Sequence, residues 1–240
     1  MTDPVIDPAT HADLFAPCGD LAARLLPYAF EGNGDGAHDL SHLVRVWRNV
    51  VAIHAREGGD LRCLAAATLL HDCVSLPKNA PDRDRASRLA AARAEPLLAA
   101  LGWSDTDIAT TLHAIEAHSF SADISPETTE AAILRDADRL DALGLIGVAR
   151  CFHVAGQMGS GLYDPADPGG LDRPLDDTRF AIDHFRTKLL HLATGFLTAT
   201  GARMARQRHR RLQTFLNDFM AEITGDAPGN PTTGAIARPD

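Results

Sequence analysis

The residues LLHDCV, 69–74, place a histidine and an aspartate side by side inside an apolar run. The residues before them, CLAAATLL, have the composition of a helix that packs into a core. An ionised carboxylate in such a place costs free energy unless an opposite charge or a metal ion pairs with it. His71 and Asp72 therefore need partners from elsewhere in the chain.

Three other segments carry side chains that could be those partners. HDLSHLVRVW puts His42 and Arg45 three residues apart, on one face of a helix. HAIEAHSF, 113–120, and RDADRLDALG, 135–144, add histidines and aspartates. Imidazole and carboxylate together bind Mn, Fe, Zn, Ni or Co, and Mg where more oxygens are available. Such a cation would balance the charge of Asp72, lower the pKa of a bound water and polarise a phosphoryl oxygen.

These segments resemble the H…HD…D pattern of the HD-domain metal-dependent phosphohydrolases. HDLSHLVRVW, LLHDCVSLPKN, HSF and LRDADRLDALGLIGVAR are similar to one bacterial branch of small, single-domain members, over roughly residues 20–220. The resemblance implies an all-α fold, the HD-domain helical bundle. It also implies hydrolysis of a phosphate ester or anhydride, with a nucleotide as the expected substrate, by attack of metal-bound water. We expect one divalent ion, Mn favoured, from Mn, Mg, Co, Ni, Fe and Zn.

The fourth metal ligand is expected in the aspartate-rich segment. Asp136 and Asp138 lie about 200° apart on a helix and cannot face the same site, whereas Asp138 and Asp141 can. The family pattern implies that the ligand is the second aspartate of DxD, which is Asp138. The expected metal ligands are therefore His42, His71, Asp72 and Asp138.

The acid–base chemistry is open. Asp72 is expected to act in catalysis as well as in metal binding, and Asp141, Glu116 or another aspartate near the ligands could be a general base. Many HD relatives carry a glutamate shortly after the HD pair, but CVSLPKN supplies Lys78 there.

Positive side chains near these segments are candidate contacts to a substrate phosphate, because arginine and lysine donate charge-assisted hydrogen bonds to it. The candidates are Arg45, Lys78, Arg83, Arg139 and, by the resemblance, Lys188. His118 is either a substrate contact or a structural cap. His113 and His118 are about 140° apart on a helix, which argues against a second metal ion.

Two other functions compete with hydrolysis. Some HD-fold proteins use a di-iron site for oxygenation, but they need more histidines than His113 and His118 supply. A sensor that binds metal and nucleotide without turnover is the second alternative. A cyclic-dinucleotide phosphodiesterase is disfavoured, because no GYP tripeptide follows the HD pair.

The elements that must hold these residues are helices. Helical spacing recurs along the chain and strand signals are nearly absent, so we expect an N-terminal extension (1–17), one helical domain (18–223) and a disordered tail (224–240). Helices are expected over about 18–30, 39–56, 61–73, from 86 with a kink or restart at Pro96, 104–118, and from Ser125 through 144, with two more over 178–223.

Composition limits the partners. The formal net charge of −9 disfavours general binding of nucleic acid or anionic membranes. No signal peptide or membrane-spanning run is expected, and the four cysteines form no CxxC pair. We therefore expect a cytoplasmic protein with reduced thiols that binds a small phosphorylated substrate and could pair as a homodimer.

Overall fold

The computed structural model describes residues 11–30, 40–74, 76 and 83–225. Within these ranges the chain forms helices and no strand, apart from an isolated bridge between Gly161 and Phe180, which confirms the all-α prediction. The α-helices are α2 (Gly19–Ala29), α3 (Leu40–Glu57), α4 (Leu61–Leu70), α5 (Ala86–Ala100), α6 (Asp105–His118), α7 (Thr129–Asp141), α8 (Gly144–Met158), α9 (Ala181–Thr187) and α10 (Ala199–Thr224). Short 3₁₀ turns are η1 (Ala12–Phe15), η2 (Arg83–Arg85), η3 (Phe120–Ala122) and η4 (Leu189–His191).

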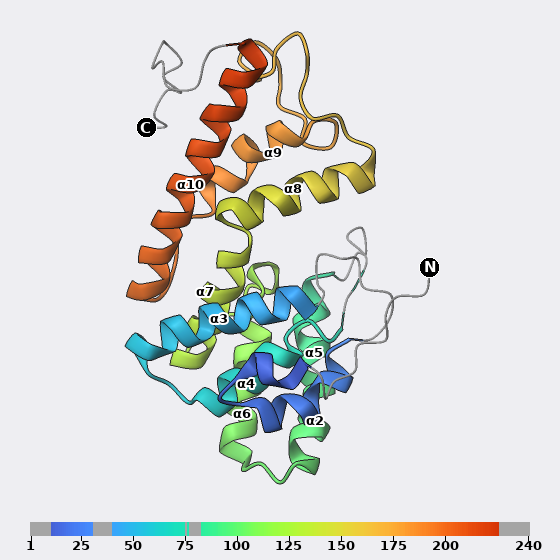
Figure 1. Cartoon of the computed structure of the whole chain (residues 1–240). Coiled ribbons are helices and arrows are strands. Elements are labelled where there is room, and N and C mark those ends of the chain that lie inside the picture. Colours follow the sequence, from blue (N-terminus) through green and yellow to red (C-terminus); the bar gives the residue numbers. More distant parts are fainter. Residues whose placement is uncertain (1–10, 31–39, 75, 77–82, 226–240) are drawn as a thin grey trace.

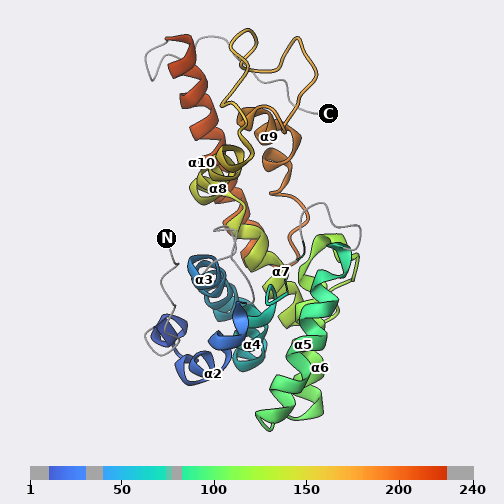
Figure 2. The same cartoon turned by 90° about the vertical axis from the view of Figure 1, so that its right-hand side faces the viewer.

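Two hydrophobic clusters organise these helices. The larger one lies among α2 to α7, and the smaller one, rich in phenylalanine, lies among α8, α9 and α10 (Figure 1). The view from the side shows α8 above α3, and α10 running from the upper helices down to α7 (Figure 2). Because α7 leads directly into α8, the chain passes from the larger cluster to the smaller one at the end of the aspartate-rich helix.

Side-chain caps set the starts of several helices. Ser104 Oγ accepts a hydrogen bond from the backbone N–H of Asp107, 3.2 Å away, so the predicted start of α6 is confirmed. The predicted start at Ser125 is wrong. Thr128 is the cap, because its Oγ1 accepts from the N–H of Ala131, and α7 begins one residue later.

Three other boundaries differ from the sequence predictions. The α4 helix ends at Leu70, so His71 and Asp72 follow it instead of lying within it. The α5 helix does not restart at Pro96, and the fully buried Ala94 and Leu98 pack on both sides of the proline. The helix expected to continue through residue 144 ends at Asp141, and α8 is a separate helix.

The packed part of the chain begins before residue 18. Phe15 is fully buried, and its ring centroid lies 6.3 Å from that of Trp47, whose Nε1 donates to the carbonyl of Ala16. At the other end, α10 ends at Thr224, and residues 226–240 of the expected tail lie outside the described residues.

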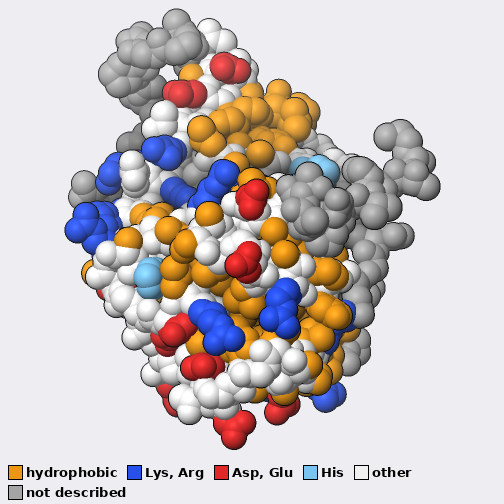
Figure 3. Space-filling model, turned by 60° about the horizontal axis from the view of Figure 1, so that its bottom comes forward, with side chains coloured by type: hydrophobic (Ala, Val, Ile, Leu, Met, Phe, Trp, Pro, Cys, Tyr) orange, Lys and Arg blue, Asp and Glu red, His pale blue; other side chains and the backbone are white. Residues whose placement is uncertain are grey.

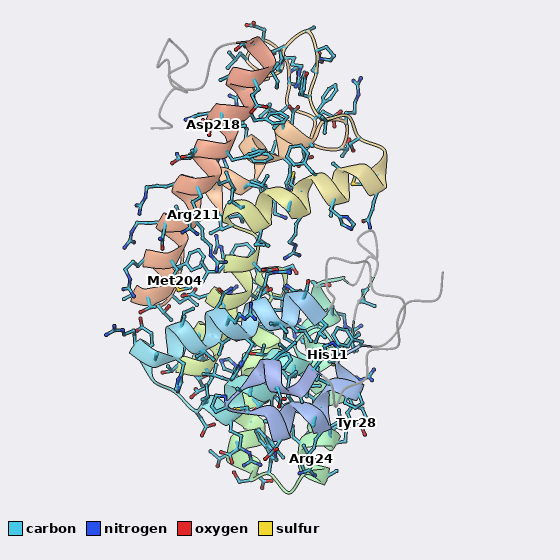
Figure 4. All side chains as sticks on the ribbon, viewed as in Figure 1. His11, Arg24, Tyr28, Met204, Arg211 and Asp218 are labelled. Atoms are coloured by element: carbon cyan, nitrogen blue, oxygen red, sulfur yellow. The ribbon has the colours of Figure 1, made fainter. Side chains whose placement is uncertain are left out.

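The surface carries charges of both signs. Arg211 and Asp218 are exposed along α10, and the lower face mixes apolar, basic and acidic side chains without one continuous basic patch (Figures 3 and 4). The four cysteines are free thiols. Among the described helices, none has the length and apolar character needed to cross a membrane.

Candidate metal centre

Four side chains, from two helices and from the turn that follows a third, converge on one point. His42 comes from the first turn of α3, His71 and Asp72 follow the end of α4, and Asp138 comes from α7. Nε2 of His71 lies 3.4 Å from Asp72 Oδ2 and 3.9 Å from Asp138 Oδ1. Nε2 of His42 lies 3.8 Å and 3.5 Å from the same two oxygens. Ligand atoms bound to one cation at about 2 Å are themselves about 3–4 Å apart, so these spacings fit a shared ion.

The position of Asp72 depends on where α4 ends. Adjacent residues inside a regular helix point about 100° apart. After Leu70 the chain turns tightly, with the N–H of Cys73 bonded to the carbonyl of Leu70, and Asp72 Oδ2 approaches the ring of His71. The end of the helix thus lets neighbouring side chains serve one site.

The back of each histidine ring is fixed by a hydrogen bond. Nδ1 of His71 lies 2.8 Å from the carbonyl oxygen of Thr68, to which it can only donate, so in the neutral ring, the form that binds a metal, Nε2 carries its lone pair toward the site. Nδ1 of His42 lies 2.8 Å from Asp141 Oδ2. Such contacts orient imidazole ligands in metal sites.

The chemistry of the cluster suits a cation. His71 is 1% exposed, and its Nε2 makes no hydrogen bond to any described residue, which is costly without a ligand. Burial disfavours protonation of this ring, but Asp72 and Asp138 raise the pKa of His71 to about 9. Burial also opposes ionisation of Asp72, yet His71 and His118 hold the pKa of its carboxyl well below the usual range. Two carboxylates thus concentrate negative charge at the two imidazoles, and His42, His71 and Asp72 alone form a group able to hold a metal ion.

His118 is a fifth side chain at this point. It is 8% exposed at the end of α6, with Nδ1 2.6 Å from the carbonyl of Ile115. Nε2 lies 3.6 Å from Asp72 Oδ1, and the ring meets that of His71 edge-on at 4.8 Å. His113, by contrast, accepts a hydrogen bond from the N–H of Glu127 and supports the loop before α7.

Asp141 lies on the side of His42 that faces away from the other metal ligands, and two arginines contact its carboxylate. Its carboxylate is 1% exposed and contacts His42 Nδ1, Arg45 Nε at 2.6 Å, Arg45 Nη2 at 3.0 Å and Arg150 Nη1 at 2.7 Å. Burial opposes its ionisation, but the bonds from His42 and Arg45 and the charge of Arg150 keep the pKa of Asp141 far below its ordinary value. Arg45 was expected to contact substrate, but its Nε and Nη2 donate hydrogen bonds to this carboxylate and its Nη1 donates to Ser41.

Asp136 faces away from the site, as helix geometry predicts. Its buried carboxylate accepts hydrogen bonds from the N–H groups of Leu197 and Thr198 and from the Thr198 hydroxyl, at 2.7–3.1 Å. The aspartate-rich helix is thereby tied to the start of α10.

The other candidates lie outside this cluster or outside the described residues. Arg139 donates to the carbonyl of Leu192 and lies over the ring of Phe196. Glu116 is half-buried on α6, and Lys188 is exposed at the end of α9. Lys78 and the side chain of Arg83 are outside the described residues.

Sequence reasoning missed Arg150 and the pair Asn49–Arg208. Asn49 Nδ2 donates to the carbonyl of Ala137 on α7, while its Oδ1 accepts from Arg208 on α10. The sequence signal that could have pointed to Arg150 is its position nine residues after Asp141, within the segment LDALGLIGVAR. Only the break between α7 and α8 brings Arg150 back to that aspartate.

Comparisons with known proteins give a consistent result. The family model described as the HD domain matches residues 39–143. The Bacillus subtilis protein YpgQ is 31% identical over 196 residues, which cover 80% of this chain and 85% of YpgQ. A solved HD-superfamily hydrolase from Bacillus thuringiensis aligns with a TM-score of 0.68 and 28% identity, over 86% of this chain and 98% of that one. The crystal structure of YpgQ in complex with ADP aligns with a TM-score of 0.63 and 27% identity, over 93% and 98% of the two chains.

Proposed function

The chain belongs to the HD-domain superfamily, and from this premise we propose that it is a divalent-metal-dependent phosphohydrolase that cleaves a phosphate ester or anhydride bond of a nucleotide. The observation that carries the proposal is the convergence of Nε2 of His42 and His71 with the carboxylates of Asp72 and Asp138. Mixed nitrogen and oxygen ligands suit Mn, Co, Ni, Fe or Zn, and Mn is the favoured ion.

The four side chains would hold the ion, and other residues would hold the side chains. Asp141 and the carbonyl of Thr68 fix the rings of His42 and His71, so little rearrangement is needed on binding. A divalent cation at this point supplies Lewis-acid stabilisation of a phosphoryl oxygen and a water of lowered pKa. Asp72 and Asp138 are each about one-third exposed, so the ligand set is open to substrate on their side.

The assignment of acid–base roles follows from what each carboxylate already contacts. Asp141 is engaged by His42, Arg45 and Arg150, and its low pKa makes it a poor acceptor of a proton, so we assign it a positioning role. Glu116 makes no hydrogen bond or ion pair in the described part of the chain. It lies two residues before His118 on α6, about 200° around the helix from that ring, so it points away from the cluster and we assign no general base.

A nucleotide is the substrate class best supported. YpgQ, a relative over most of the length of both chains, has been crystallised with ADP. This chain carries a net charge of −9, so an anionic substrate needs a local positive site, which the metal centre and its neighbouring arginines would supply.

Metal reconstitution tests this proposal. The purified chain would be stripped with a chelator and given Mn, Mg, Co, Ni, Zn or Fe one at a time, together with nucleoside mono-, di- and triphosphates. Release of phosphate and pyrophosphate would be measured separately, with Asp72→Ala as the inactive variant and Asp218→Ala, exposed on α10, as the matched control. We expect metal-dependent turnover in the wild type and in Asp218→Ala and none in Asp72→Ala. Nucleotide binding without turnover under every metal would indicate a sensor instead, and absence of metal binding would refute the site.

A further inference from the structure

We propose that Arg150 binds the phosphate group adjacent to the one that reacts, which makes the site selective for nucleoside di- and triphosphates over monophosphates. This inference rests on the proposed function, because it assumes a nucleotide in the metal centre. It adds a substrate contact on α8, a helix that carries none of the metal ligands.

Two nitrogens of the Arg150 guanidinium remain available as hydrogen-bond donors at the edge of the site. Its Nη1 bonds Asp141, while Nε and Nη2 make no hydrogen bond to any described residue. The side chain is 26% exposed, against 1% for Asp141, so the guanidinium reaches from the buried carboxylate toward solvent. Nε and Nη2 form one edge of the guanidinium, and such an edge binds phosphate oxygens in a bidentate manner.

The charges around Asp141 favour an anion here. Arg45 bonds both oxygens of Asp141, and Arg150 bonds one of them as well. The single negative charge of this carboxylate is therefore shared by two arginines. The charge of Arg208 also interacts with the Asp141 carboxylate, but in the part of the chain that the structure describes its nitrogens bond only neutral oxygens, those of Leu140 and Asn49. Positive charge therefore exceeds negative charge among these described groups, and half-buried charge of one sign is stabilised by a ligand of the other.

The position of Arg150 matches a second phosphate and not the first. Asp141 connects Arg150 Nη1 to Nδ1 of His42, and Nε2 of the same ring faces Asp72 and Asp138. One carboxylate and one imidazole thus separate the guanidinium from the point where the metal ligands converge. Among the described residues Arg150 bonds Asp141 and none of the four metal ligands, so we assign the phosphate at the metal to those ligands and the next phosphate of a diphosphate to Arg150.

The corner between α7 and α8 holds Arg150 at this place. Gly147, one turn before Arg150 on α8, lies so close to the carbonyl of Ala142 that a Cβ could not be accommodated without movement. Arg150 thus comes from the upper helices and the metal ligands from the lower ones (Figure 1). A diphosphate would contact both groups of helices.

Direct binding measurements separate this role from catalysis. Calorimetry with Mn²⁺ would compare AMP with the methylene analogue of ADP, which resists hydrolysis, on wild type, Arg150→Met and Arg150→Lys. Loss of hydrogen bonds to a charged group predicts that Arg150→Met weakens the ADP analogue by about 10- to 100-fold and AMP by less than about 3-fold. Arg150→Lys keeps the charge, and its affinity for the ADP analogue should fall between those of the wild type and Arg150→Met. The control Arg24→Gln changes an exposed arginine of α2, far from α8 (Figure 4), and should match wild type.

Other outcomes would overturn the inference in distinguishable ways. Equal weakening of AMP and the ADP analogue, or loss of bound Mn²⁺ in Arg150→Met, would mean that Arg150 acts only by supporting Asp141. Thermal unfolding of each variant would identify misfolding. If Arg150→Met misfolds, the nucleotide affinities of Arg150→Lys decide whether Arg150 contacts the second phosphate. Failure of the wild type to bind either nucleotide would refute the nucleotide substrate itself, and with it this role.

Discussion

Nδ1 of His42 lies 2.8 Å from Oδ2 of Asp141, while Nε2 of the same ring faces the carboxylates of Asp72 and Asp138. One imidazole thus connects a buried carboxylate, held by two arginines, to the candidate metal position. The contact joins α3 to the last residue of α7, so the geometry of the site depends on where α7 ends.

Asp141→Asn is expected to weaken Mn²⁺ binding by about 10- to 100-fold, the usual effect of losing the partner of a ligating histidine. The amide keeps the size of the side chain but removes the charge that holds the ring and both arginines. Equilibrium dialysis against Mn²⁺ would measure the affinity, with Asp218→Asn as the exposed control. Unchanged Mn²⁺ affinity would mean that Asp141 does not position His42.

Substitutions of Asp136 and Asp138 are expected to affect different properties, stability and metal-dependent turnover respectively, although the two residues are only two positions apart. Asp136→Ala leaves buried N–H groups of Leu197 and Thr198 without their acceptor, and should lower the free energy of unfolding by about 1–3 kcal/mol. Asp138→Ala should change metal-free stability little and abolish metal-dependent turnover. Urea unfolding of the metal-free variants would measure the first effect. Equal destabilisation by the two substitutions would contradict the assignment.

Substitution of His118 tests whether the site holds one metal ion or two. We expect one ion per chain in both wild type and His118→Ala, with a raised KM in the variant if His118 contacts substrate. The reason is that His113 supports a loop, which leaves His118 as the one additional histidine at the described cluster. Metal analysis of dialysed protein would check this. Two ions in the wild type and one in His118→Ala would make His118 a ligand of a second ion, and would reopen the di-iron alternative.

Two glycines of α8 should respond oppositely to alanine. A Cβ at Gly147 would collide with the carbonyl of Ala142, so Gly147→Ala should destabilise the fold by about 1–3 kcal/mol. A Cβ at Gly156 meets open space, and Gly156→Ala should stabilise it by roughly 0.5–1 kcal/mol. Thermal unfolding of the pair would test the close approach of α7 and α8, since similar effects would argue against it.

Asp183 should make the upper helices sensitive to acid. Burial opposes its ionisation, but Arg173 and the N–H of Asp176 lower its pKa in the folded chain. A group whose pKa is lowered by folding stabilises the protein above its ordinary pKa of about 4, and that stabilisation is lost as the pH falls further. Asp183→Asn should therefore lower stability at pH 7, with a smaller difference from wild type near pH 3. Urea unfolding at both pH values would measure this, and a difference independent of pH would contradict it.

Helical periodicity in the sequence was enough to predict an all-α chain, and the resemblance of the segments around His42, His71–Asp72 and Asp138 to a known family predicted the HD domain. Helical spacing recurs from α2 to α10, and the cap at Ser104 is local chemistry that a linear sequence displays. The same rules place Asp138 and Asp136 on opposite sides of one helix, as observed, because helix geometry depends only on residue spacing.

Tertiary structure decided the rest. The end of α4 at Leu70, the start of α7 at Thr129 and the break after Asp141 depend on turns and caps that compete with helical propensity. Arg150 reaches Asp141, and Arg208 reaches Asn49, only because distant helices pack together. The sequence by itself thus determined which residues could bind a metal and that helices would carry them. The close packing of α7, α8 and α10 decided which charges surround those ligands, since such contacts join residues far apart in the chain.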